Sequence, residues 1–137
     1  MALVTARPAG WLLDNSLAAR LRDEKVAAAV SRIMEPIGLC PMGRLEQLYS
    51  ATSGRDYDSK ATLLRQTFVE IAPPPDVLDQ ALELQRDLAH HHGRWHRVPL
   101  PDLRSAITAL HNNFGVLHND KDYERIAKAR PLITRQI

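Results

Sequence analysis

The chain has 137 residues, of which 45% are hydrophobic and 25% are charged, and its formal net charge is +2. These values are typical of one compact globular domain, and the single cysteine excludes an internal disulfide and a cysteine-rich zinc module. No apolar run approaches the roughly 20 residues of a membrane-spanning helix, and the N-terminus lacks the apolar core of a signal peptide. We therefore expect a cytoplasmic protein without a membrane segment, folded as a single domain over 1–137 with a flexible extension at 1–9.

Short apolar runs alternate with longer amphipathic ones, and this alternation predicts an α/β fold. In the first half, the pattern predicts a buried strand at 11–13, a helix over 17–21 that Ser16 caps, a helix over about 23–35, and a second buried strand at 37–40. Pro41 then opens another helix, a helix over 53–67 begins at a Ser-Gly turn, and residues 68–72 carry a weak strand signal.

The second half continues this alternation. The predicted elements are a helix that Asp76 caps and that buries Leu84 and Leu88, a loop over 90–101, a helix that begins at Asp102, a strand at 116–118, a helix over 121–129, and a short strand at 132–134. Gly115 is expected to end the helix that begins at Asp102. This order predicts a central, mainly parallel sheet of about four or five strands.

Carboxylates recur near the carboxyl ends of the predicted strands. Asp14 follows the first strand, Glu46 lies early in the helix after the second, and Asp120 follows the strand at 116–118, with Asp122 two residues further on. Asp102 begins the helix that leads into that same strand and runs antiparallel to it. Because the carboxyl ends of parallel strands share one edge of a sheet, we expect these acids to converge there.

Carboxylates forced together repel one another, so such a cluster is costly unless a hard cation neutralises it. Mg²⁺ and Mn²⁺ accept oxygen ligands and can activate water for phosphodiester cleavage. Each acid alone has a simpler interpretation. Asp102 and Asp120 could be helix N-caps, and Glu46 could be a solvated helix residue.

Four blocks of the sequence resemble the PIN-domain ribonucleases of the VapC toxin family. They are WLLDNSLA at 11–18, CP at 40–41 with EQLYS at 46–50, PDL at 101–103, and VLHNDKDYERIA at 116–127. The blocks occur in family order and extend from about residue 10 to residue 134. The resemblance implies a PIN-like α/β/α sandwich and a single PIN domain.

The resemblance also implies an Mg²⁺- or Mn²⁺-dependent endoribonuclease toxin, a homodimer, and a cognate VapB-type antitoxin. The catalytic residues that match the family are Asp14, Glu46, Asp102 and Asp120. The metal ligands implied are Asp14, Asp102, Asp120 and Asp122, and Ser16 matches a hydroxyl residue that supports the first acid. Asn15 and Arg104 depart from the residues usual at their positions.

Basic and aromatic residues near these acids are candidates for RNA contacts. Trp95 lies between Arg94 and Arg97, and an exposed aromatic ring there could stack on an unpaired base, although packing of Trp95 over the core is an equal alternative. Arg104 and Lys121 could meet phosphates or simply face solvent. The histidine run at 90–92 with His96 is interpreted as an exposed helix end and loop, because consecutive histidines point in different directions.

Two other classes of function remain open from the sequence. One is a non-catalytic PIN-fold module that binds RNA or protein. The other is a phosphotransfer domain of receiver or haloacid-dehalogenase type, which also carries an aspartate after its first strand. The haloacid-dehalogenase pattern needs a second aspartate two residues later, where this chain has Ser16.

Overall fold

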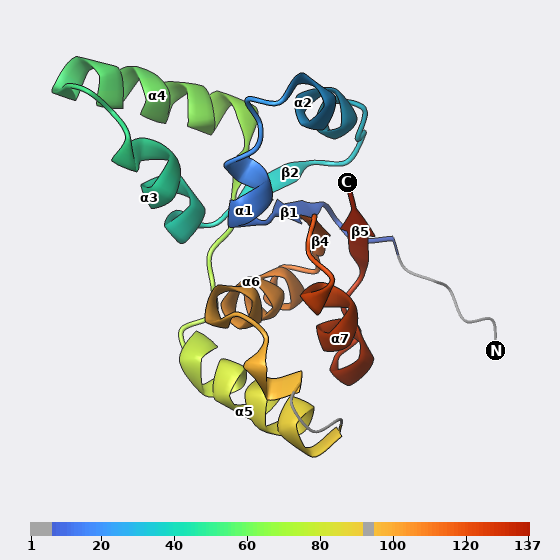
Figure 1. The fold of residues 1–137 in the computed structure, drawn as a ribbon. Helices are drawn as coiled ribbons and strands as arrows, with labels where there is room; N and C mark the ends of the chain where they lie inside the picture. Colours follow the sequence, from blue (N-terminus) through green and yellow to red (C-terminus); the bar gives the residue numbers. More distant parts are fainter. Residues whose placement is uncertain (1–6, 92–94) are drawn as a thin grey trace.

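A computed structural model describes residues 7–91 and 95–137 of the chain. Its centre is a five-stranded, entirely parallel sheet in the order β3-β2-β1-β4-β5 (Figure 1). The strands are β1 (Trp11–Leu13), β2 (Ile37–Leu39), β3 (Val69–Glu70), β4 (Gly115–His118) and β5 (Thr134–Gln136). The predicted α/β class with a mainly parallel sheet of four or five strands is therefore confirmed.

Helices cover both faces of this sheet (Figure 1). The helices are α1 (Asn15–Ala18), α2 (Glu24–Ser31), α3 (Pro41–Tyr49), α4 (Gly54–Thr67), α5 (Val77–His91), α6 (Leu100–His111) and α7 (Asp122–Ala129), with a 3₁₀ turn η1 (Trp95–Arg97). One core cluster packs α1 and α2 on the sheet, and a larger one packs α5, α6 and α7 on the opposite face. No helix in the described part of the chain is long and apolar enough to cross a membrane.

Strand β1 shows why the sheet lies at the centre. Its three residues are buried; Leu12 belongs to the larger core cluster, whereas Trp11 and Leu13 belong to the other. Successive strand residues point to opposite faces, so a strand covered on both sides reads as a continuous apolar run.

The strand order reverses at β1. The chain moves from β1 outward to β2 and β3, and then crosses to β4 on the other side of β1. Open parallel sheets bind ligands outside the carboxyl ends of the strands at such a point. Asp14 directly follows β1 and Asp120 follows β4, so the topology brings both residues to this position.

Several predicted boundaries were wrong at helix starts. Asp14, not Ser16, is the N-cap of α1, and its side chain accepts a hydrogen bond from the Ser16 backbone N–H. Helix α6 begins at Leu100 with Pro101 in its first turn, because proline has no N–H to leave unpaired there. The predicted loop over 90–101 is correspondingly interrupted by the end of α5, by η1 and by the start of α6.

The predicted end of the helix before Gly115 and the predicted bounds of the last strand were also wrong. Asn113, with φ of 57°, takes the left-handed conformation after α6, so Gly115 does not end this helix. Gly115 instead begins β4, where an added Cβ would lie 2.6 Å from the Trp11 ring. The last strand spans Thr134–Gln136 rather than 132–134, because Leu132 turns into the core.

Candidate active site

A cleft of about 370 Å³ opens at the carboxyl edge of β1 and β4. All four acids predicted to be catalytic line it, although they are separated by up to 106 residues in the sequence. The full lining is Asp14, Asn15, Ser16, Ala19, Glu46, Pro99, Pro101, Asp102 and Asp120. The structure thus gathers these acids at one place.

Asp14 is held in a fixed orientation inside this cleft. It is only 3% exposed. Its Oδ2 accepts hydrogen bonds from the backbone N–H of Ser16, at 3.2 Å, and from the Ser16 hydroxyl. Its Oδ1 accepts a hydrogen bond of 2.5 Å from the hydroxyl of Tyr123. Three donors therefore determine which way this carboxyl group faces.

The carboxylates of Asp102, Asp120 and Asp122 form a tight group. One oxygen from each lies within 4.8 Å of the others. Asp102 projects from the first turn of α6, and the Asp122 backbone N–H donates to Asp120 Oδ1 at 2.9 Å, which ties α7 to the end of β4. Within residues 7–91 and 95–137, the one cation paired with this group is Arg125, 3.5 Å from Asp122.

The electrostatics of this group follow from burial and mutual repulsion. Burial raises the pKa of Asp102 to about 8, aided by its hydrogen bond with Asp120 and by the nearby charge of Asp14. Burial also favours a higher pKa for Asp120, but hydrogen bonds from Asp102 and Asp122 outweigh it and hold that pKa below its usual value. Burial and Asp120 raise the pKa of Asp122. Without a cation, the raised pKa of Asp102 favours its protonated form near neutral pH.

Two observations show that a hard divalent cation fits this group. Asp102 is 6% exposed, and its buried Oδ2 has no hydrogen-bond partner among the described residues, whereas buried polar atoms are normally satisfied. The cluster also offers several carboxylate oxygens, the ligands that Mg²⁺ and Mn²⁺ prefer. A bound cation would displace the proton of Asp102 and satisfy the unpaired oxygen.

Glu46 occupies a different place from the other acids. It lies on α3, is solvent-exposed, and lines the wall of the cleft without joining the group of three carboxylates. Helix α3 begins at Pro41, directly after β2, so Glu46 is more than one turn away from the sheet edge. Asp14 also lines the cleft without belonging to that group, so the predicted convergence is tightest for Asp102, Asp120 and Asp122.

Two buried residues beside the acids were not singled out from the sequence. His118, at the end of β4, accepts a hydrogen bond of 3.1 Å from the Asp120 backbone N–H through Nδ1, and burial lowers its pKa, which favours the neutral ring. Tyr123 is fully buried, and burial, with the charges of Asp14 and Asp102, raises its pKa far above the usual value. Nothing in the spacing distinguishes Tyr123 from an ordinary core residue.

The residues predicted to contact RNA fall in different environments. Trp95 is half-buried against the larger core cluster, and the Arg125 guanidinium lies 5.9 Å from its ring centre. Arg97 and Lys121 are exposed, whereas Arg94 lies outside the described residues. Arg104 borders a hollow of about 160 Å³ that shares Asn15 and Pro101 with the acidic cleft.

The histidine run forms no metal site in the described part of the chain. His90 and His91 end α5 and are exposed, whereas His92 lies outside the described residues. The single group of metal-ligating side chains found across 7–91 and 95–137 is the one formed by Asp102, Asp120 and Asp122.

Comparison with known proteins identifies the family. The sequence model of the PIN domain matches residues 12–129. Ribonuclease VapC17 of Mycobacterium tuberculosis is 50% identical over 124 residues, which cover 88% of this chain and 90% of that protein. Ribonuclease VapC21 of the same species is 34% identical over 128 residues, covering 92% and 89%.

Solved structures share the fold at low sequence identity. VapBC2 from Rickettsia felis, bound to a DNA fragment from its promoter, superposes with a TM-score of 0.68 at 13% identity, covering 93% of this chain and 98% of that one. A toxin–antitoxin complex from Klebsiella pneumoniae gives a TM-score of 0.67 at 15% identity, covering 93% and 100%. Together, the family match, the relatives and the topology show that this chain belongs to the PIN-domain family, within the VapC ribonucleases of toxin–antitoxin systems.

Proposed function

We propose that this chain is an endoribonuclease toxin that hydrolyses RNA phosphodiester bonds with Mg²⁺ or Mn²⁺ bound in the acidic cleft. The observation that carries the proposal is the group formed by Asp102, Asp120 and Asp122, because it combines a buried unpaired oxygen with a carboxyl group that keeps its proton near neutral pH. Such an arrangement is unfavourable for a scaffold and suits a cation site. The relatives named as ribonucleases support the choice of RNA as substrate.

The residues that line the cleft would have different roles in the reaction. A bound divalent cation would supply an activated water and stabilise the charge that develops on the phosphate. Asp102, Asp120 and Asp122 would hold the cation, and Asp14, which lines the same cleft in the orientation that Ser16 sets, would add a fourth carboxylate ligand. Glu46 adds negative charge on the α3 wall.

RNA would enter past a basic border. Arg104 is half-buried and lines the hollow next to the acidic cleft, and Lys121 is exposed between Asp120 and Asp122 in the sequence. Guanidinium and ammonium groups at such positions bind phosphates and fix the register of the strand, rather than read its bases.

The test is cleavage of RNA by purified protein in the presence of Mn²⁺. We expect cleavage by the wild type, its loss after chelation with EDTA, and its loss in Asp14→Asn. Asp79→Asn, an exposed change on α5, is the matched control and should cleave like the wild type. Cleavage that survives both EDTA and Asp14→Asn would contradict the proposal, and RNA binding that ignores divalent ions would favour the non-catalytic module.

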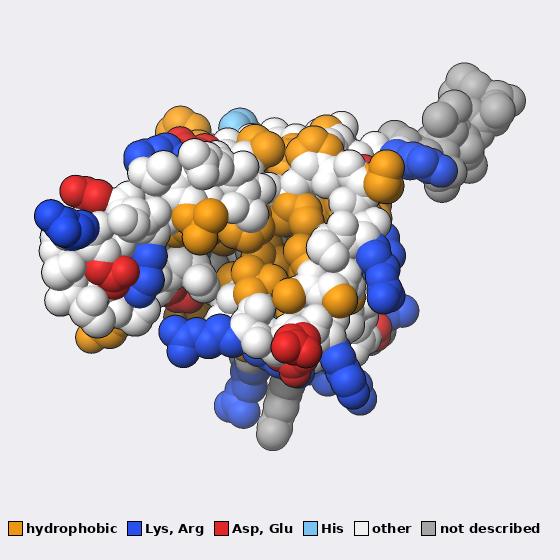
Figure 2. Space-filling model, turned by 90° about the horizontal axis from the view of Figure 1, so that it is seen from above, with side chains coloured by type: hydrophobic (Ala, Val, Ile, Leu, Met, Phe, Trp, Pro, Cys, Tyr) orange, Lys and Arg blue, Asp and Glu red, His pale blue; other side chains and the backbone are white. Residues whose placement is uncertain are grey.

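A VapB-type antitoxin is the expected partner, and α4 offers a surface for it. This helix of 14 residues packs Leu64 and the following Phe68 against the cluster formed with α1 and α2, but its Tyr57 and Leu63 are 43% and 61% exposed. Figure 2 shows the molecule from the side of α4 and α2, where hydrophobic side chains gather in the middle of the face and Lys and Arg lie towards its rim. An amphipathic helix needs a partner for its apolar face, and we expect backbone amides of α4 to gain hydrogen-exchange protection when an antitoxin binds.

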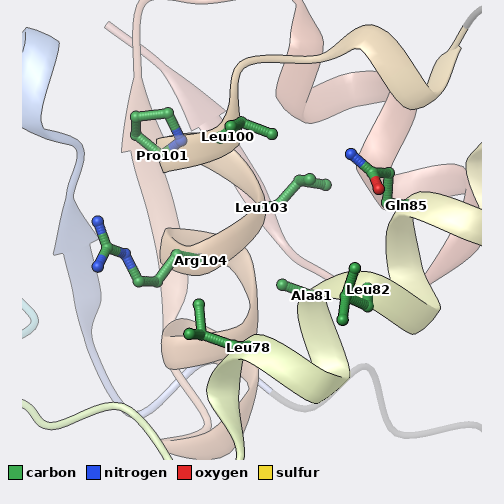
Figure 3. Close-up of a pocket in the computed structure, with 8 residues that line it drawn as sticks. All are labelled: Leu78, Ala81, Leu82, Gln85, Leu100, Pro101, Leu103 and Arg104. Carbon is green, nitrogen blue, oxygen red and sulfur yellow. The ribbon is translucent and has the colours of Figure 1, made fainter.

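A second copy of the chain is the proposed occupant of another apolar surface. A groove of about 430 Å³ lies between α5 and α6, and Leu78, Leu82 and Leu100 along it are 67%, 62% and 69% exposed. In Figure 3, the leucines of both helices border the gap, and the Arg104 side chain points away from it. The surface thus combines protruding leucines with a hollow, as a self-complementary two-fold interface requires.

A further inference from the structure

The buried hydroxyl of Tyr123 connects two halves of the acidic site. Tyr123 lies in the first turn of α7, directly after Asp122, and its hydroxyl donates to Oδ1 of Asp14 across 109 residues of sequence. The phenol thus adds a side-chain link between the segment that carries Asp120 and Asp122 and the segment that follows β1.

The packing of Tyr123 leaves its hydroxyl little freedom. The side chain is fully buried in the larger core cluster, and its ring centre lies 4.9 Å from that of His118 at a tilt of 40°. His118 in turn accepts the backbone N–H of Asp120. A ring fixed on this side presents its hydroxyl to Asp14 at one position, so the hydrogen bond is preorganised rather than adaptable.

The hydrogen bonds of Asp14 determine what it can offer to a cation. A carboxylate has about four acceptor positions. The Ser16 backbone N–H and hydroxyl occupy those of Oδ2, and Tyr123 occupies one on Oδ1. One position on Oδ1 remains, in a side chain that lines the cleft beside Asp102 and Asp120.

We propose that Tyr123 is a positioning residue for the cation site, which holds Asp14 so that Oδ1 presents a single acceptor position to the metal. This inference rests on the proposed metal-dependent function. Without the phenol hydroxyl, the carboxyl group of Asp14 could rotate and bind the cation in more than one way, with a lower affinity. Tyr123 itself contacts neither cation nor RNA.

The test is the Mn²⁺ affinity of Tyr123→Phe, measured by isothermal titration calorimetry without RNA. The variant keeps the ring and loses only the hydroxyl. We expect the dissociation constant for Mn²⁺ to rise by about 10-fold or more, within the range found when a partner of a metal ligand is removed. Tyr57→Phe, a half-exposed tyrosine on α4, is the matched control and should bind Mn²⁺ like the wild type.

A purely structural role for Tyr123 would give a different result. The melting temperature in EDTA would then fall while the dissociation constant for Mn²⁺ stayed unchanged, and this outcome would overturn the proposal. RNA cleavage should respond in parallel, with the Mn²⁺ concentration for half-maximal rate rising in Tyr123→Phe.

A second measurement leaves Tyr123 in place. The chain has three tyrosines, so in Tyr49→Phe/Tyr57→Phe labelled with 3-fluorotyrosine, residue 123 gives the one fluorine resonance. We expect that resonance to shift on titration with Mg²⁺ and to saturate at the concentration found by calorimetry. A resonance that stays fixed while Mg²⁺ binds would count against the contact with a metal ligand.

The two proposals fail separately. If the wild type binds Mn²⁺ and Tyr123→Phe binds it more weakly, but neither cleaves RNA, the positioning role stands and the proposed ribonuclease function falls. If both proteins bind Mn²⁺ equally and cleave RNA, the function stands and the positioning role falls. A wild type that binds no divalent cation at all overturns both.

Discussion

The acidic cleft and the groove between α5 and α6 are hollows of similar size, about 370 and 430 Å³, with opposite chemistry. Both include Pro101, in the first turn of α6. Asp102 in that turn faces the cleft, whereas Leu100 and Leu103 face the groove. The first turn of α6 therefore contributes side chains to both the cleft and the groove.

The two hollows are unfavourable in the isolated chain for different reasons. The cleft brings carboxylates close enough to repel one another, and Asp102 Oδ2 has no hydrogen-bond partner among the described residues. A bound cation would reduce this repulsion and coordinate the unpaired oxygen. The groove leaves large leucine side chains in water, which an apolar protein surface relieves. The class of ligand that each hollow would bind therefore follows from the kind of unfavourable contact that the hollow contains.

The largest expected effect comes from removing a charge in the cleft. Asp120→Asn keeps the size of the side chain but removes a ligand, so we expect RNA cleavage to fall by more than about 100-fold, beyond the range for residues that only support a ligand. Self-association through the groove should be unchanged, as measured by sedimentation velocity. If Asp120→Asn cleaved RNA at the wild-type rate, Asp120 would not be a ligand of the catalytic cation.

The second prediction breaks the groove instead. Leu82→Asp puts a charge on the α5 side of the groove. Burying one leucine side chain contributes about 1.5–3 kcal/mol, and a two-fold interface contains this residue twice. We therefore expect the dimer dissociation constant to rise by about 100-fold or more. Leu63→Asp on α4 is the matched control, because Leu63 is 61% exposed against 62% for Leu82. Equal self-association of the two variants would show that the groove is not the interface. Mn²⁺ affinity should be the same in both.

The third prediction uses the raised pKa of Asp102. Its folded-state pKa is about 8 against an ordinary value of 3.8, so in the metal-free protein the folded state alone holds this proton between these values. Stability in EDTA should therefore fall as pH rises from about 4 to 8. Asp102→Asn lacks this proton, and we expect its melting temperature to exceed that of the wild type by roughly 3–8 °C at pH 8, but by less at pH 5.

Addition of Mn²⁺ sharpens this third test. At pH 8, the wild type should recover thermal stability on binding the cation, whereas Asp102→Asn should gain little. Differential scanning calorimetry at both pH values gives the comparison. The prediction would be contradicted if, in EDTA, the melting temperature rose between pH 5 and pH 8 by more in the wild type than in Asp102→Asn.

The smallest effect is expected at the border between the two hollows. Arg104→Ala should raise the KM for RNA by about 3–10-fold and leave kcat nearly unchanged, because a phosphate contact positions the strand equally before and during reaction. The salt dependence of KM should also become less steep. Arg86→Ala, an exposed change on α5, serves as the control and should leave both unaltered. A fall in kcat without a change in KM would place Arg104 in the chemistry instead.

The sequence predicted the parallel sheet and the meeting of Asp14 and Asp120 from local pattern alone. Apolar runs of three or four residues are sufficient when a strand is buried on both faces, and the rule that parallel strands share a carboxyl edge does the rest. The same pattern predicted that Asp102 and Glu46 would converge there, the family resemblance added their catalytic roles, and the structure places both in the cleft lining. Only Asp102 joins the cluster, because it comes from the first turn of α6, while Glu46 comes from a later turn of α3.

Other features had no local signal. Tyr123 looks like any aromatic core residue, and its contact with Asp14 depends on how α7 packs over β4 and β1. Asn113 takes the left-handed conformation after α6, whereas Gly115 begins β4, where an added Cβ would lie 2.6 Å from the Trp11 ring. The glycine at 115 is thus explained by its packing against Trp11 and not by the end of a helix.

The amino-acid sequence by itself determined the fold class, the order of the strands along the chain and the residues able to bind a hard cation, because these follow from periodicity and side-chain chemistry. The tertiary structure alone decided which carboxyl group has a strongly raised pKa, which hydroxyl orients Asp14, and that one turn of α6 separates a charged cleft from an apolar groove. Those properties depend on distances and burial between residues far apart in the chain, and such distances exist only after packing.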